Sequence, residues 1–224
     1  MKTFRHFSLF CGAVALAGVL TAQQPAVIEW SAESYPTIQK VEGSPQIVQT
    51  KLGPAVYFDG VSAVFLDSNP LAGLSQLTME VIFKPDGDGK FAQRFMHLGT
   101  MRERLMLETR VNPDGTWYFD AHTQLPDDKG RLTLIDDKLL HPTDRWYNVT
   151  LVISPTMQTT YVNGVPQKWG NLNYVPIDGG VTSVGVRQNV VDFFKGTIYK
   201  IRVTPRVLVP RDFLKDHEVL NQAE

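Results

Sequence analysis

The chain has 224 residues, of which 22 are basic and 23 acidic, so its formal net charge is −1. This length is enough for one domain with a substantial hydrophobic core. The balanced charge argues against a nucleic-acid-binding protein and against a polybasic membrane-surface protein, since both need a concentrated positive field.

Residues 1–22 have the three-part layout of a secretory signal peptide. Lys2 and Arg5 supply the positive start, an apolar stretch runs from 7 to 20, and small or polar residues follow. An uncleaved membrane anchor is the alternative, although the apolar stretch is short for a span. We expect an exported protein that is secreted, periplasmic or on the cell surface, with no membrane span after cleavage.

The cleavage site has two candidates, after Ala22 and after Ala17. Either cleavage removes Cys11, the only cysteine of the chain. We therefore expect a mature chain without disulfide bonds that depends on burial of its core for stability.

The rest of the chain consists of short β-type segments separated by turns. The turns at Asp59-Gly60, at 112–115 and at Asn163-Gly164 are expected to close β-hairpins, because Gly tolerates the positive φ that such turns need. The only expected helical structure is a single turn from Pro210 to Leu214. Many short strands joined in this way predict a sandwich or barrel, with residues 23–224 as one domain. The expected strands are 26–30, 55–58, 62–66, 78–84, 95–98, 105–111, 116–123, 146–154, 158–162, 181–186 and 192–203.

Four segments carry a recognisable pattern: a strand running into Phe-Asp-Gly, a strand ending in Phe-Lys-Pro, a strand that starts at Trp and leads to an Asn-Gly hairpin, and a closing strand with Gly-Thr-Ile. They lie at 55–67, 78–85, 145–165 and 195–208. Their order and spacing resemble the LamG-type domains of the concanavalin A-like lectin/glucanase superfamily. The resemblance implies an all-β, two-sheet antiparallel β-sandwich, a jelly roll, with its core at about 26–215.

Two sequence features argue against an enzyme. Glucanases of this superfamily carry Glu-x-Asp-x-x-Glu on one strand, where alternation brings the acids to one face. No Glu of this chain is followed two places on by Asp, and the Gln-Ile-His motif of jelly-roll polysaccharide lyases is also missing. The sequence therefore favours a binding module.

The strands 105–111 and 116–123 form the strongest candidate site. If their apolar residues share one face, the other face carries two carboxylates with Arg, Tyr and His side chains. Such a face suits the binding of sugar hydroxyl groups, or acid–base chemistry if burial shifts the pKa values. The alternative is a solvated face with cross-strand ion pairs. The candidate ligand-binding residues are Glu108, Arg110, Tyr118, Asp120 and His122.

A second candidate site lies in segment 168–174, which is rich in Gly and Asn and is expected to be a loop. An exposed Trp169 and Tyr174, with Asn173 between them, would stack on a pyranose ring and bond its hydroxyl groups. The alternative is that Trp169 folds back as a lid on the sandwich edge. The other tryptophans are expected in the core: Trp30, Trp117 and Trp146.

Calcium is the one cofactor that the sequence suggests. Asp59 and Asp67, with Asn69, are the expected ligands, and Asp86 and Asp88 form a second group of hard oxygen ligands in a turn. The alternative is that these are ordinary turns. Tyr199 and Lys200 occupy places where the resembled family often carries an acidic pair, which weakens a calcium role there.

Three functions remain open on this evidence. The first is a carbohydrate- or glycoconjugate-binding module. The second is a protein-interaction or adhesion module on the same fold, and the third is a hydrolase or lyase using Glu108, Asp120 and His122. The expected partner is thus a glycan or a surface protein, and not a nucleic acid.

Overall fold

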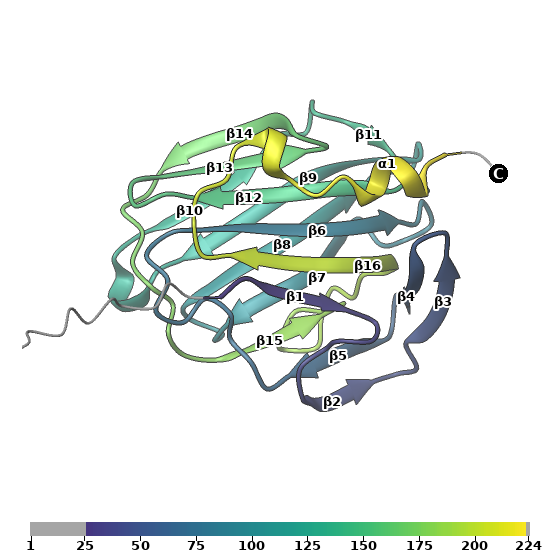
Figure 1. The fold of residues 1–224 in the computed structure, drawn as a ribbon, viewed down its shortest axis with the longest axis horizontal. Coiled ribbons are helices and arrows are strands. Elements are labelled where there is room, and N and C mark those ends of the chain that lie inside the picture. The colour runs from purple at the N-terminus through teal and green to yellow at the C-terminus, as the bar shows by residue number, and fades with distance from the viewer. Residues whose placement is uncertain (1–25, 223–224) are drawn as a thin grey trace, which may run out of the picture.

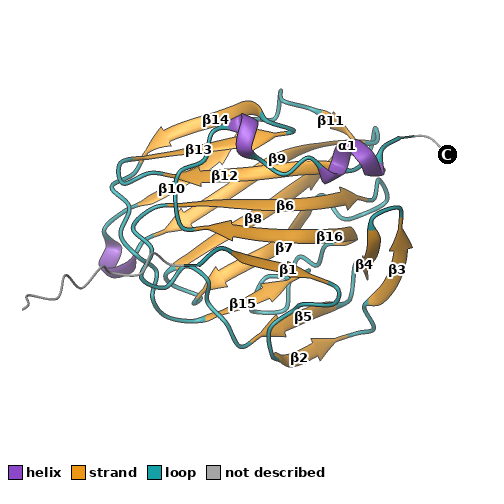
Figure 2. Ribbon diagram, viewed as in Figure 1, coloured by secondary structure: helices purple, strands orange, loops and turns teal. Residues whose placement is uncertain are grey.

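The computed structural model describes residues 26–222, which form a sandwich of two antiparallel sheets (Figures 1 and 2). The predicted signal peptide and Cys11 lie outside the described residues. Figure 2 shows that strands make up most of the fold and that its helical turns are short. The all-β sandwich predicted from the sequence is therefore confirmed.

Each sheet has eight strands. Sheet A lies toward the viewer in Figure 1, and its spatial order is β14 (Val165–Asn171), β13 (Met157–Val162), β12 (Tyr147–Ile153), β6 (Leu77–Pro85), β16 (Lys195–Thr204), β4 (Gly53–Asp59) and β3 (Gln46–Thr50), with β1 (Ile28–Ser31) paired to β16. Sheet B lies behind it, in the order β10 (Arg131–Ile135), β9 (Thr116–Gln124), β8 (Arg104–Val111), β7 (Ala92–Gly99), β15 (Val181–Val184), β5 (Ala63–Leu66) and β2 (Ile38–Glu42), with β11 (His141–Pro142) paired to β9. The helical elements are η1 (Pro126–Asp128), η2 (Pro210–Asp212) and α1 (Asp216–Leu220). The turn predicted from Pro210 is confirmed by η2, whereas the expectation of no other helical structure is wrong, because η1 and α1 are too short to show a helical period in the sequence.

Large aromatic side chains fill the space between the sheets. Phe83 from sheet A stacks on Phe95 from sheet B with 4.8 Å between ring centroids, and Trp117 meets Phe83 edge-on at 5.2 Å. All three side chains are fully buried. Aromatic pairs in these geometries add to the stabilisation that area burial supplies. The cluster thus fixes the two sheets against each other and sets which residues face outward.

The prediction that Trp146 is a core residue is wrong. The strand begins one residue later, and Tyr147 takes the core position, with its ring 5.1 Å from that of Trp117. Because alternate residues of a strand face opposite sides, Trp146 lies half-buried on the outer side, 5.9 Å from Lys84 Nζ. Trp30 and Trp117 are buried in the core as predicted.

One predicted hairpin is also wrong. The turn at Asp59-Gly60 carries the chain from sheet A to sheet B, because β4 pairs with β3 and β16 whereas β5 pairs with β2 and β15. Gly60 has a φ of 87°, which confirms the predicted positive φ at this glycine. Turn chemistry marks where the chain changes direction but not which strand the next segment joins. The hairpins at 112–115 and at Asn163-Gly164 are confirmed.

The segment that follows β16 crosses the outer face of sheet A, as the yellow end of the ribbon shows in Figure 1. Its Leu208 and Phe213 pack with Val152 of β12, and the Phe213 ring lies 5.2 Å from that of Tyr161. Strand β6 is consequently buried on both faces along almost its whole length. The outer face of sheet A is therefore largely used to hold the C-terminal segment.

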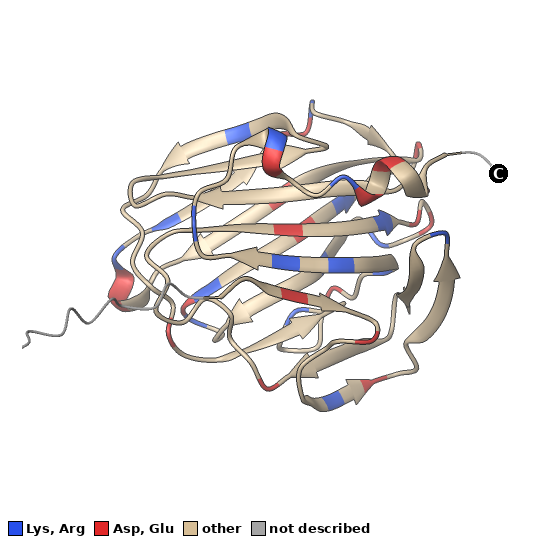
Figure 3. Cartoon of the chain, in the orientation of Figure 1, with Lys and Arg blue, Asp and Glu red and all other residues tan. Residues whose placement is uncertain are grey.

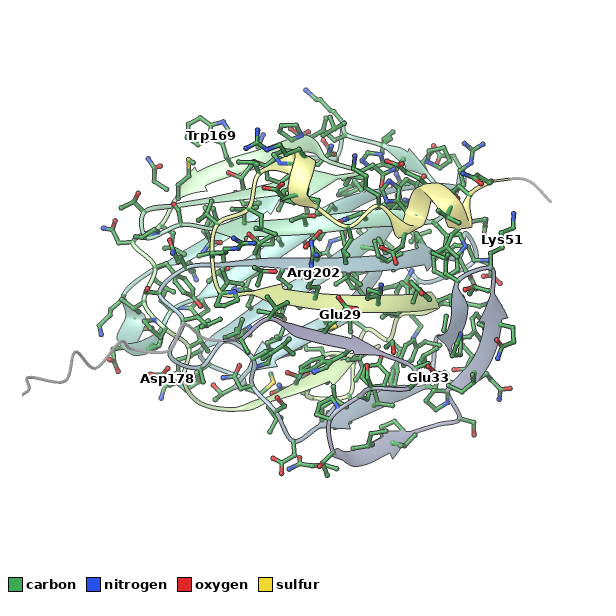
Figure 4. All side chains as sticks on the ribbon, in the orientation of Figure 1. Glu29, Glu33, Lys51, Trp169, Asp178 and Arg202 are labelled. Carbon is green, nitrogen blue, oxygen red and sulfur yellow. The ribbon has the colours of Figure 1, made fainter. Side chains whose placement is uncertain are left out.

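A buried carboxylate anchors this segment. Glu80 of β6 is fully buried and accepts hydrogen bonds from Arg202 Nε at 2.7 Å and from the backbone N–H of Leu214 at 2.6 Å. Asn148 Nδ2 donates a third at 3.2 Å. Figure 3 shows the acidic position on β6 beside basic positions on β16, and Figure 4 labels Arg202. Charge-assisted bonds of this kind offset the cost of burying the charge.

We expect Glu80→Gln to lower the free energy of unfolding by about 2 kcal/mol, because it leaves the guanidinium of Arg202 without its counter-charge. Urea unfolding followed by circular dichroism measures the change. Glu33→Gln is the matched control, since Glu33 is exposed. Equal stability of the two variants would show that Glu80 does not anchor the segment.

Candidate functional site

The strongest candidate site is the outer face of sheet B around β8 and β9. In their register Glu108 stands opposite Asp120, Arg110 opposite Tyr118, and Met106 opposite His122. The predicted hairpin register is thus confirmed, and the predicted polar residues share one face. Arg94 of β7 pairs with Glu108, so that Arg94, Glu108 and Asp120 form one row across three strands.

Two buried carboxylates lie at the base of this face. The side chains of Glu108 and Asp120 are each only 2% exposed. Arg110 joins them: its Nη2 lies 3.0 Å from Glu108 Oε2, and its Nε donates to Asp120 Oδ2 at 3.1 Å. Arg94 adds an ion pair to Glu108 at 2.9 Å and one to Asp192 at 2.6 Å. The acids therefore hold two arginines in fixed positions.

Both carboxyl groups, Glu108 and Asp120, have raised pKa values. Burial, and then the charge of Asp120, raise the pKa of Glu108 to about 7, although Arg94 and Arg110 act in the opposite direction. Burial also raises the pKa of Asp120 above its ordinary value, against the effect of Arg110. Two like charges at close range in a poorly solvated site cannot both ionise freely. Glu108 therefore exchanges its proton near neutral pH.

His122 is neutral and has a defined tautomer. Burial and the charges of Arg104 and Arg131 lower its pKa to about 4. Arg104 Nη2 lies 3.4 Å from His122 Nε2, and because a guanidinium only donates, Nε2 must accept. Nδ1 then carries the hydrogen and donates to Thr133 Oγ1 at 2.8 Å. The ring therefore adds no charge to the site near pH 7.

These side chains line a hollow of about 220 Å³. The sequence predicted four of its nine lining residues, and the predicted Tyr118 is not among them, because the rest of the lining comes from β7, β10, the start of β8 and the loop after β15. Extending the alternation of β8 backward from Arg110 and Glu108 would have found Arg104, whereas no local signal marks Arg187. The lining residues are Arg94, Arg104, Met106, Glu108, Arg110, Asp120, His122, Thr133 and Arg187.

A second hollow of about 520 Å³ adjoins the first, since Arg104 lines both. Its walls come from residues 101–104 and from the loop around η1. Asp127 and Asp128 of that loop have positive φ values of 52° and 54°, a conformation that L-residues adopt at a cost. Together the two hollows offer room for more than one sugar residue.

The predicted platform of Trp169, Asn173 and Tyr174 does not exist. Trp169 belongs to β14 rather than to a loop, and it is 66% exposed at the edge of sheet A (Figure 4). Asn173 is exposed, but Tyr174 is only 6% exposed and packs in the core. The cause is that the extended chain after β14 inserts Leu172 and Tyr174 inward while its backbone bonds to Pro155 and Thr156. Trp169 lies on the outer side of sheet A, whereas Glu108 lies on the outer face of sheet B.

The predicted calcium ligands are not brought together. Asp59 precedes β5 and Asp67 follows it, so the length of the strand separates them. Asp59 Oδ1 instead accepts the Val61 backbone N–H at 3.1 Å, and Asp88 pairs with Lys195. Within residues 26–222 no group of three or more His, Cys, Asp or Glu side chains is placed to hold a metal ion. The Asp-Gly segments at 59–60 and 86–87 lie where the chain bends or turns.

Comparison with known proteins supports the fold. A family model described as the concanavalin A-like lectin/glucanases superfamily matches residues 58–212. A search of curated proteins finds no match to the sequence. No helix among residues 26–222 combines the length and apolar character that crossing a membrane requires.

Solved structures with the same fold have low sequence identity. Domain 4 of AbnA, a GH43 extracellular arabinanase from Geobacillus stearothermophilus in complex with arabinotriose, is 18% identical with a TM-score of 0.54, and 91% of each chain is covered. The CBM40 of the Ruminococcus gnavus IT-sialidase, bound to α2,3-sialyllactose, is 15% identical with a TM-score of 0.54, covering 81% of this chain and 98% of that one. The binding domain of Paraclostridial Mosquitocidal Protein 1 is 11% identical with a TM-score of 0.58, and the match covers 79% of this chain but only 46% of that one.

We expect Arg110→Met to lower the free energy of unfolding by about 3 kcal/mol at pH 8, because it leaves two buried carboxylates without their shared cation. Loss of Arg110 raises both folded-state pKa values further above their unfolded values. The folded state then binds protons more tightly, so the deficit shrinks as pH falls from 8 to 5.

Urea unfolding at several pH values measures this deficit. Arg211→Met is the matched control, since the Arg211 side chain is 85% exposed. A deficit that does not change with pH would contradict the role given to the acidic pair.

Proposed function

The chain belongs to the concanavalin A-like lectin/glucanase superfamily, and we propose that it is an exported binding module for carbohydrates or glycoconjugates. The observation that carries this proposal is the hollowed outer face of sheet B, where buried carboxylates hold arginines beneath an opening lined by polar side chains. A polar lining with side chains fixed in advance suits a ligand rich in hydroxyl groups.

The chemistry of the face fits a sugar ring. At one end of the hollow Thr133 supplies a hydroxyl group, and His122 holds Thr133 and Arg104 in place through its two ring nitrogens. Tyr118, the cross-strand partner of Arg110, does not itself line the hollow, but its ring lies 6.5 Å from that of Phe91, which is 55% exposed. An exposed aromatic ring beside polar groups is the combination that receives the apolar face of a pyranose.

A hydrolase or lyase that uses Glu108, Asp120 and His122 is less well supported. Two-carboxylate glycoside hydrolysis needs the acids on either side of the scissile bond. Here Glu108 and Asp120 face each other across one strand pair, share Arg110, and are each 2% exposed. They are therefore placed to position arginines rather than to reach a substrate.

A protein-interaction or adhesion module is the second candidate, and one observation favours it. Ile38 and Val41 on the edge strand β2 are 47% and 49% exposed, and Ile47 on the edge strand β3 is 59% exposed. Exposed apolar side chains on edge strands mark places where another chain can pair or pack. This surface is separate from the hollow of sheet B.

The proposal is tested by screening the full chain against an array of glycans. We expect binding to a defined glycan class, and we expect His122→Ala to weaken it about tenfold, because Arg104 and Thr133 lose the hydrogen bonds to the ring that hold them in place. Trp169→Ala, on the opposite sheet, should leave binding unchanged. Absence of binding to any glycan, or loss on Trp169→Ala alone, would contradict the proposal and favour another surface.

A further inference from the structure

The four arginines of the sheet B hollow fall into two groups. Arg94 and Arg110 are committed to carboxylates: Arg94 to Glu108 and Asp192, and Arg110 to Glu108 and Asp120. Arg104 and Arg187 also line the hollow, yet within residues 26–222 neither forms an ion pair. The hollow thus contains two positive side chains that have no carboxylate of the described residues at ion-pair distance.

Arg187 is held in place without being neutralised. The next residue, Gln188, donates its backbone N–H to His97 Nδ1 at 3.3 Å and its side chain to the carbonyls of Gly99 and Val181 at 3.1 and 2.9 Å. These bonds tie the loop after β15 to sheet B. The Arg187 Nε is buried and has no hydrogen-bond partner in the part of the chain that the structure describes.

Arg104 is likewise held in place without an ion pair. Its Nη1 donates to the backbone carbonyls of Met101 and Arg102 at 2.8 and 3.1 Å, while its Nε is buried with no partner among the described residues. Arg104 and Arg187 line the same small hollow, and burial and then the charge of Arg187 lower the pKa of Arg104, against the effect of Glu108. Two preorganised cations that repel each other are stabilised by an anion placed between them.

The remaining charges of the face do not cancel this excess. Four arginines stand against three carboxylates, which leaves one positive charge, and a proton on Glu108 leaves two. His122 contributes none near pH 7, as its lowered pKa shows. The charged residues counted are Arg94, Arg104, Arg110, Arg187, Glu108, Asp120 and Asp192.

We propose that the ligand of this hollow is an acidic glycan, and that Arg104 and Arg187 bind its carboxylate or sulfate group. The inference rests on the proposed function, because it assumes that the hollow receives a sugar. Guanidinium groups present several N–H donors in a plane, a geometry that matches carboxylate and sulfate oxygens. The adjoining hollow beyond Arg104 leaves room for the neighbouring sugar residues.

The site also implies a direction of pH dependence. Glu108 is faced by Arg94 from β7, Arg104 and Arg110 from β8, Asp120 from β9 and Arg187 from the loop after β15. Its pKa of about 7 means that it gains a negative charge as pH rises from 6 to 8. That charge repels an anionic ligand, so we expect the affinity for an acidic glycan to fall severalfold over this range.

The proposal is tested with an array of matched glycan pairs, in which each carboxylated or sulfated glycan is printed beside its carboxyl-reduced or desulfated form. Binding concentrated on the acidic members is expected, and carboxylated and sulfated pairs show which anion is preferred. Equal binding to the neutral members would overturn the inference and leave the proposed function standing. Absence of binding to every glycan would overturn both.

Variants then locate the anion site, with titration calorimetry of the best acidic glycan as the measurement. Arg104→Gln and Arg187→Gln are each expected to weaken binding at least about tenfold. Arg104→Lys and Arg187→Lys keep the charge but lose the planar donor geometry, so we expect a smaller loss of affinity than in the Gln variants. These variants are expected to fold. Arg211→Gln, which removes the same charge from an exposed position, should bind like the parent. Equal loss in Arg211→Gln, or no loss in either Gln variant of the site, would overturn the assignment.

Discussion

Two acidic side chains that face each other inside the fold determine the chemistry of sheet B. Glu108 and Asp120 occupy opposite positions on neighbouring strands, and almost no water reaches either. Like charges in such a place require cations at contact distance, and Arg94 and Arg110 supply them from β7 and β8. This constraint fixes a polar, positively charged surface on a sheet whose other face packs in the core.

The two sheets use buried charge in different ways. On sheet A, Glu80 receives hydrogen bonds from Arg202, Leu214 and Asn148, and the result is a C-terminal segment anchored over the sheet. On sheet B, the Nε atoms of Arg104 and Arg187 are buried without partners in residues 26–222. A buried polar group with all its partners stabilises the fold, whereas a buried donor without a partner destabilises it until an acceptor is supplied. This contrast supports the proposal that the outer face of sheet B binds a ligand, while the outer face of sheet A holds the C-terminal segment.

Short-range sequence patterns correctly predicted the features that depend on residues close together in the chain. Alternation and a turn at 112–115 were enough to place Glu108 opposite Asp120, because both strands belong to one hairpin. The same reasoning missed Arg187, which reaches the site from a loop far along the chain, and misplaced Tyr174, whose burial depends on the core beneath it. Edge strands β2 and β3 were missed because their sequences are polar and exposed, with little of the apolar alternation that marks a half-buried strand. Long-range pairing and tertiary burial therefore account for the errors.

The most direct measurement follows the Nε–H signals of arginine side chains by NMR while methyl β-D-glucuronide is added, with methyl β-D-glucoside as the uncharged match. We expect saturable shifts of the Arg104 and Arg187 signals with the glucuronide, little change with the glucoside, and no change at Arg211. Shifts that are absent at Arg104 and Arg187, or equal at Arg211, would contradict the claim that these two arginines form an anion site on sheet B.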